Sequence, residues 1–175
     1  MRLSILLAAT FVMAIPLGLF GCGGGESSSG TSACFDYSKF QGTTPTVSFK
    51  TDVLPVFRNS CALSGSCHGD QGAPETQPYL GPPNSAGVPS DTDIKAIFDK
   101  NVNVESLKAK GMKIVKPSDP DNSFLMHKMD SSLACDAVTC DGTACGQPMP
   151  LGTPTLAQDK RDIVRRWIAQ GAKND

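Results

Sequence analysis

Residues 61–69 of the chain are Cys61-Ala-Leu-Ser-Gly-Ser-Cys67-His68-Gly69, with five residues between the two cysteines. On a straight helix, two residues six positions apart are separated by about 9 Å along the axis. The intervening residues need not be helical, because Gly65 can adopt a positive φ and let them fold out as a bulge. Such a bulge would bring the two thiols together, and it would also allow the Cα separation of about 4.4–6.8 Å that a disulfide needs.

Two cysteines followed directly by a histidine are typical of c-type haem attachment, whose usual pattern is C-x-x-C-H. The thiols add to the porphyrin vinyl groups, and the imidazole binds the iron. The present pattern is C-x5-C-H, with three additional residues. It predicts that Cys61 and Cys67 attach haem and that His68 is the proximal ligand. The alternative is a local Cys61–Cys67 disulfide without haem.

A second axial ligand is expected for an electron carrier, commonly a methionine thioether, which favours the reduced iron. Met149 lies between Pro148 and Pro150. Because proline fixes φ and stiffens a loop, this position suits a ligand that must be held against iron. The alternatives are that Met149 only fills a gap in the core, or that His127 is the sixth ligand. Otherwise His127 is an ordinary helix residue.

The N-terminal residues 1–21 are expected to be a signal peptide, because Arg2 precedes the apolar run 5–20. This run is short for a membrane span, which needs about 20 residues. Residues 19–22, Leu-Phe-Gly-Cys, resemble the bacterial lipoprotein box. This box implies that Cys22 is lipidated, and two or three acyl chains would anchor the protein stably. Secretion without lipid and a retained span are the alternatives.

The anchor can be tested by replacing Cys22 with serine. We expect Cys22→Ser to release the protein from the membrane fraction without harming the domain. A variant that stays in the membrane fraction would show instead that residues 5–20 are a retained span.

The predicted organisation is a signal peptide at 1–21, a lipidated cysteine with a flexible linker at 22–45, and one helical domain at 46–175. The linker prediction rests on its Gly/Ser-rich start, which has no apolar side chains to offset the entropy of ordering it. The domain prediction is all-α, since no strand-like alternation competes with the helical periodicity. The long loop 69–90 is rich in glycine and proline.

Four helices are expected in this domain. The first covers about 51–60, and the second follows Ser90 as N-cap. The third opens with Asp119 as N-cap and Pro120 at its first position. The fourth covers about 157–170 and ends at Gly171. In the fourth helix the basic residues are expected to form a solvated face; they are Lys160, Arg161, Arg165 and Arg166.

The cysteine count fits an oxidising compartment, where free thiols are unusual. With Cys22 lipidated, six cysteines remain. If Cys61 and Cys67 carry haem, the other four form two disulfides in one of three pairings; they are Cys34, Cys135, Cys140 and Cys145. If no haem is bound, all six pair. This parity argues against a cysteine nucleophile and against a cysteine-rich zinc site.

The net charge of −1 argues against a nucleic-acid or acidic-membrane partner. The carboxylates are scattered over expected helix faces and form no acid–base constellation with a histidine. We therefore expect no enzymatic activity. The alternative is an enzyme whose haem iron has one protein ligand and is open to substrate on the other side.

Over about residues 49–172 the chain resembles a class I c-type cytochrome domain, in the subgroup found on secreted and lipid-anchored bacterial proteins. The matching residues, in chain order, are Phe49, 53–57, 60–61, 66–69, Val115, Pro117, 119–120, Ser123, Leu125, 145–146, 149–150, Ile163, 167–168 and 171–172.

This resemblance implies a small cytochrome c-like helical domain with one covalent haem c and its iron. Cys61 and Cys67 would be thioether donors, His68 the proximal ligand and Met149 the distal ligand. The implied function is electron transfer with a redox partner protein at the bacterial cell envelope, by a lipid-anchored protein facing the periplasm or the outer surface. A haem-free, disulfide-stapled binding or structural lipoprotein on the same scaffold is the alternative function.

Overall fold

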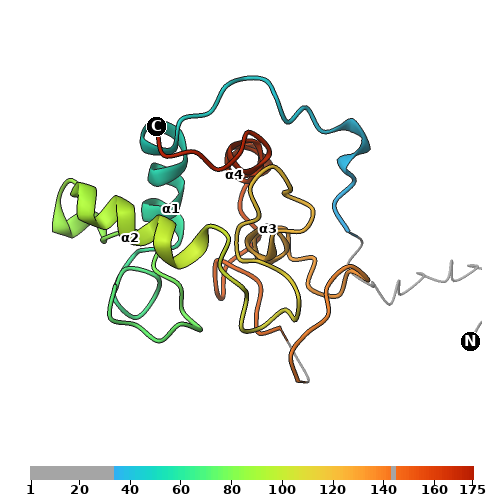
Figure 1. Cartoon of the computed structure of the whole chain (residues 1–175). Helices are drawn as coiled ribbons and strands as arrows, with labels where there is room; N and C mark the ends of the chain where they lie inside the picture. Colours follow the sequence, from blue (N-terminus) through green and yellow to red (C-terminus); the bar gives the residue numbers. More distant parts are fainter. Residues whose placement is uncertain (1–33, 143–144) are drawn as a thin grey trace, which may run out of the picture.

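The computed structural model describes residues 34–142 and 145–175. The predicted all-α class is confirmed, since the described part contains helices joined by loops and only isolated β-bridges. Figure 1 shows α3 and α4 end on, with α1 and α2 running across the view. The α-helices are α1 (Leu54–Ser60), α2 (Asp91–Asn101), α3 (Phe124–Met129) and α4 (Gln158–Ala169), and the shorter turns are η1 (Tyr37–Lys39), η2 (Phe49–Val53) and η3 (Asn84–Ala86).

Three of the four predicted helices occur where the sequence places them. The helix predicted at 51–60 consists of a short π-helix, η2, that runs directly into α1. Pro55 lies in the first turn of α1. Ser90 caps α2, and its side chain and that of Asp93 form a reciprocal capping box. α4 ends as predicted at Gly171, which has a φ of 101°.

The predicted start of the third helix at Asp119 is wrong, because α3 begins at Phe124. The N–H groups of Phe124 and Leu125 donate to the carbonyls of Lys113 and Ile114 (2.8 and 2.9 Å). Since these N–H groups are taken by an earlier segment, they are not available to carbonyls one helical turn back. The Asp119 carboxylate instead accepts from the Asn122 side chain in a turn.

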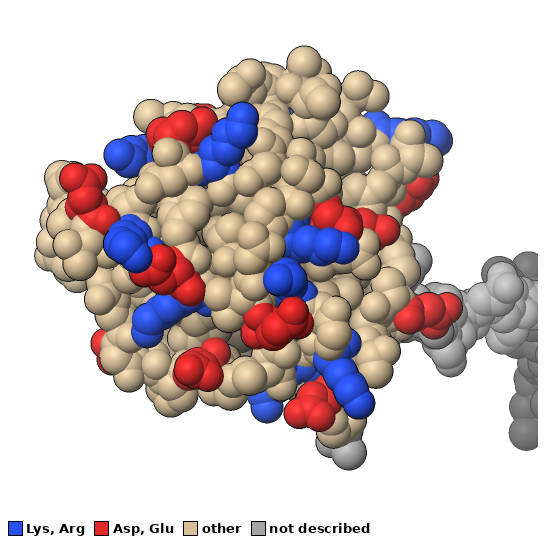
Figure 2. All heavy atoms as spheres, viewed as in Figure 1, with Lys and Arg blue, Asp and Glu red and all other residues tan. Residues whose placement is uncertain are grey.

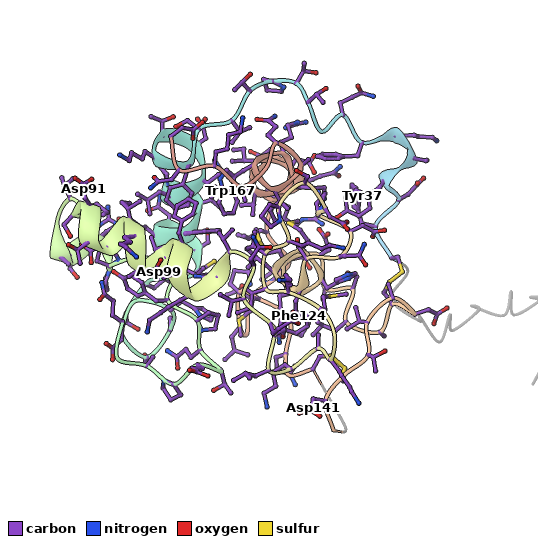
Figure 3. The ribbon with its side chains drawn as sticks, in the orientation of Figure 1. Tyr37, Asp91, Asp99, Phe124, Asp141 and Trp167 are labelled. Atoms are coloured by element: carbon purple, nitrogen blue, oxygen red, sulfur yellow. A yellow bond between two sulfur atoms is a disulfide. The ribbon has the colours of Figure 1, made fainter. Side chains whose placement is uncertain are left out.

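The core lies where η2, α1, α2 and α4 meet. Trp167 of α4 lies between α4 and α1 in Figure 3, and its ring packs against Phe49, Phe57 and Phe98 with centroids 5.3–6.2 Å apart. Trp167 and Phe49 are almost fully buried. Offset and edge-to-face ring pairs of this kind contribute about 0.5–1.5 kcal/mol beyond their buried area. This cluster fixes α1, which leads directly into Cys61.

The predicted solvated face of α4 is wrong for Arg165, whose side chain is fully buried. Its guanidinium donates to both carboxylate oxygens of Asp130 (2.6 and 2.7 Å) and also pairs with Asp162. Arg161 donates to the same Asp130 carboxylate at 2.5 Å. A charged side chain at the core side of an amphipathic helix is tolerated here because two carboxylates compensate its charge, although the Arg165 Nε has no hydrogen-bond partner among the described residues.

Residues 34–45, which belong to the predicted linker, pack against α4. The Phe35 ring lies 3.6 Å from the Arg165 guanidinium carbon, and Tyr37 (labelled in Figure 3) lies 5.8 Å from it. Gln170, the residue directly after α4, donates to the carbonyls of Gly42 and Pro45. The packed unit therefore begins before residue 46, because aromatic side chains of this segment cover a buried cation.

The prediction of two disulfides among four cysteines is confirmed, with the pairs Cys34–Cys135 and Cys140–Cys145. The first joins the N-terminal segment to the loop after α3, and Figure 3 shows it in yellow at the right of the molecule. The second closes a short loop. Of the three possible pairings, the structure has this one.

The predicted N-terminal features, including the signal peptide and lipidation at Cys22, lie outside the described residues. Within the described ranges, no helix has the length and apolar character needed to cross a membrane. On the face viewed in Figure 2, acidic and basic side chains are interspersed.

Candidate functional site

The segment from Cys61 to Gly69 folds back on itself directly after α1. The His68 N–H donates to the Cys61 carbonyl at 3.1 Å. In a helix this bond joins residues four apart, which is the separation of the first cysteine and the histidine in C-x-x-C-H. Here it joins residues seven apart. The three additional residues are therefore accommodated in a bulge that restores the helical pairing of Cys61 with His68.

The bulge closes through backbone contacts rather than through the predicted positive φ of Gly65. Gly65 is not among the described glycines with positive φ. The N–H groups of Cys67 and Gly69 both donate to the Ser64 carbonyl at 3.1 Å. A Cβ at Gly69 would lie 2.7 Å from the same carbonyl oxygen, so the residue after His68 must approach the backbone closely.

His68 is held in one tautomer by the long loop that follows it. Its Nδ1–H donates to the Pro78 carbonyl at 2.8 Å, so Nε2 carries the lone pair. The Leu80 N–H donates to the His68 carbonyl at 2.9 Å, which fixes the backbone too. Burial lowers the pKa of His68, and the nearby Lys128 ammonium lowers it further. A neutral imidazole with its second nitrogen bonded to a backbone carbonyl is the usual form of a metal-ligating histidine.

Two adjoining cavities share Cys61, His68, Thr76 and Met149 in their walls. Their volumes are about 910 and 890 Å3, including space open to solvent. The second also includes Cys67. The structure thus brings together all four residues that the sequence predicts to hold a cofactor.

The first cavity, which we call the apolar cavity, has mainly hydrophobic walls. They come from the loop after His68, from the segment before α3 and from α3 itself; the apolar lining residues are Pro78, Leu80, Ile114, Phe124, Leu125 and Met129. Three leucines with half or more of their surface exposed continue this apolar surface at the cavity edges, namely Leu63, Leu107 and Leu151. A ligand with a large apolar surface is favoured here.

Cys61 and Cys67 are both unpaired within the described part of the chain. Cys61 is buried, and this burial, together with the proximity of Cys67, raises the pKa of its thiol to about 12. Cys61 is therefore a neutral thiol at pH 7. Cys67 is half-buried, and its sulfur accepts a hydrogen bond from the Ser64 hydroxyl at 3.5 Å.

Met149 lies in a loop that Lys128 of α3 holds. The Lys128 ammonium donates to the carbonyls of Cys145 and Gln147 (2.6 and 2.8 Å), and the Lys128 carbonyl accepts from the Met149 N–H at 2.9 Å. The Cys140–Cys145 disulfide ties the start of the same loop. Met149 is thus positioned by one residue of α3 as well as by its two prolines.

His127 does not line either cavity. It is buried in α3, where its two ring nitrogens contact the Ser132 hydroxyl (3.0 Å) and the Asp121 carbonyl (2.9 Å). Both nitrogens are therefore occupied by structural hydrogen bonds. This agrees with the reading of His127 as a helix residue rather than as the sixth ligand.

Two residues that position this site were not predicted from the sequence. Pro78 acts through its backbone carbonyl, which no sequence pattern distinguishes from the other carbonyls of the loop. Lys128 precedes Met129 in a helix whose predicted role was packing. Lys128 contacts Cys145 and Gln147, which are 17 and 19 positions later in the chain, so no local sequence pattern predicts these contacts.

No group of three or more His, Cys, Asp or Glu side chains that could by itself hold a metal ion occurs in residues 34–142 and 145–175. In comparisons with known proteins, no family model, no curated protein and no solved structure matches the chain.

Proposed function

We propose that this protein is a monohaem c-type electron carrier, with haem attached through Cys61 and Cys67 and ligated by His68 and Met149. The observation that carries the proposal is that these four residues, predicted from the sequence, line one pair of adjoining cavities. Bound haem would supply an iron that cycles between Fe(II) and Fe(III) and so carries one electron.

The residues around the cavities fit a haem. The mainly hydrophobic walls of the apolar cavity suit the apolar faces of a porphyrin. His68 offers Nε2 in the neutral form that metal binding requires, because Nδ1 is occupied by the Pro78 carbonyl. The donor set of one imidazole and one thioether is a known haem ligation.

The chain's own contribution to attachment is a pair of free thiols beside the axial histidine. In each addition, the cysteine sulfur would bond one carbon of a vinyl group and the thiol hydrogen would go to the other carbon, so no oxidant would be consumed. The backbone hydrogen bond from the His68 N–H to the Cys61 carbonyl supports this role, because it gives the C-x5-C-H segment the backbone pairing of the shorter motif. The mainly hydrophobic walls would favour the less charged, reduced iron.

The second candidate is a haem-free lipoprotein with three disulfides. The unpaired state of Cys61 and Cys67, beside two formed disulfides, favours the haem proposal over it. In line with the sequence prediction, we propose that the carrier is lipid-anchored through Cys22 at the bacterial cell envelope and exchanges electrons with a redox partner protein.

The test is intact-mass analysis of protein matured with a c-haem attachment system, followed by spectroscopy of Met149→Ala. We expect one covalent haem in the parent protein and a weak near-infrared band from thioether ligation in its oxidised form. Met149→Ala should abolish this band and leave the haem attached, because the cysteines and His68 are unchanged.

Met126→Ala is the matched control, because Met126 is a buried core residue that lines neither cavity. It should keep the band. A parent protein without haem and with two hydrogens fewer at Cys61 and Cys67 would refute the haem proposal and favour the disulfide-stapled scaffold.

A further inference from the structure

Two lysines line the apolar cavity. Lys108 comes from the loop between α2 and α3, and Lys128 comes from α3. Neither ammonium forms an ion pair within the described residues. Glu75 is the one carboxylate in the same wall, and it too is absent from these pairs. The wall therefore carries two positive charges without an ionic partner beside a mainly apolar surface.

Lys128 is the more constrained of the two. Its ammonium is half-buried and donates to two neutral carbonyls, those of Cys145 and Gln147. An ammonium has three donors, so one N–H remains. A partly desolvated cation beside a second cation is costly unless an anion compensates it.

We propose that Lys108 and Lys128 bind the propionate carboxylates of the haem. This inference rests on the proposed function. A haem carries two carboxylates on an otherwise apolar ring, which matches two cations in the wall of an otherwise apolar cavity. Hydrogen bonds between ammonium and carboxylate groups are charge-assisted and about twice as strong as neutral ones. Pairing would neutralise both lysines and orient the ring within the cavity.

The alternative partners of the two ammonium groups are limited. The other titratable groups in the wall are Cys61, His68 and Glu75. A test that follows the titration of the protein as a whole would mix these groups with the propionates. The experiment must therefore observe the haem carboxylates alone.

The experiment uses the full-length, haem-loaded protein with 13C at the propionate carboxyl carbons. Their NMR resonances are followed against pH in the reduced state. In Lys108→Met, at least one resonance should titrate at a pH about one unit or more higher than in the parent, because an adjacent cation lowers a carboxyl pKa by about 1–3 units. Lys128→Met should have the same effect. Lys128→Arg keeps the positive charge, so its propionate resonances should titrate as in the parent.

Lys110→Met is the matched control, because Lys110 is an exposed lysine of the same loop that lines neither cavity. The propionate resonances of the haem in Lys110→Met should titrate as in the parent. Since Lys128 also holds the Met149 loop, Lys108→Met is the cleaner variant; no hydrogen bond of its side chain is found among the described residues.

Haem-loaded Lys108→Met and Lys128→Met proteins whose carboxyl resonances titrate as in the parent would overturn the inference while leaving the haem proposal intact. A parent protein that carries no haem would overturn the proposed function itself, and intact mass separates the two results before any titration.

Discussion

His68→Ala should yield protein without stably bound haem when it is matured beside a parent that carries one. The imidazole is the proposed proximal ligand, and its loss would remove the group that holds the iron next to the attachment cysteines. It also removes the donor to the Pro78 carbonyl, at a cost of about 1 kcal/mol. The measurement is intact mass together with the visible absorption of the purified protein.

The control is the chain's other histidine, His127, which lies outside both cavities. His127→Gln should still carry covalent haem, although its hydrogen bonds within α3 are altered. Imidazole added during maturation of His68→Ala should restore haem binding if the variant is folded, because it can occupy the vacated position. Full haem loading of His68→Ala without imidazole would contradict the assigned proximal ligand.

The second large effect is expected for stability. Asp130→Asn should lower the free energy of unfolding by about 3–5 kcal/mol, because it leaves a buried arginine without its main counter-charge. Asp130 is almost fully buried and accepts from Arg165 and Arg161 at 2.5–2.7 Å. The substitution keeps the size of the side chain and removes only its charge. Urea unfolding of the protein with both disulfides intact measures the difference.

Asp99→Asn provides the comparison, because Asp99 pairs with Lys95 on the exposed face of α2, where both side chains are more than half exposed. An exposed pair of residues four apart in a helix contributes about 0.3–0.5 kcal/mol. Equal losses in the two variants would show that the Asp130–Arg165 pair contributes no more than a surface pair.

Local signals in the sequence were sufficient to predict the positions of most of the helices. Ser90 and Asp93 cap α2 because both partners of the capping box lie within four residues of one another. Gly171 ends α4 because a positive φ is needed at that one position. The start of α3 was mispredicted for the opposite reason, since its first N–H groups donate to Lys113 and Ile114, which are 11 residues earlier in the chain.

Sequence alone determined the all-α class, and it predicted Cys61, Cys67, His68 and Met149 as the residues of the candidate site while leaving two or three disulfides open, because these inferences depend on residue type and short-range spacing. Tertiary structure decided which cysteines pair, that Arg165 is buried against Asp130, that the Pro78 carbonyl orients His68, and that Lys128 holds the Met149 loop. Apart from the Cys140–Cys145 disulfide, whose cysteines are five positions apart, each of these contacts joins residues 10 to 101 positions apart. Such contacts arise only when packing brings distant segments together, and no local pattern of side chains encodes them.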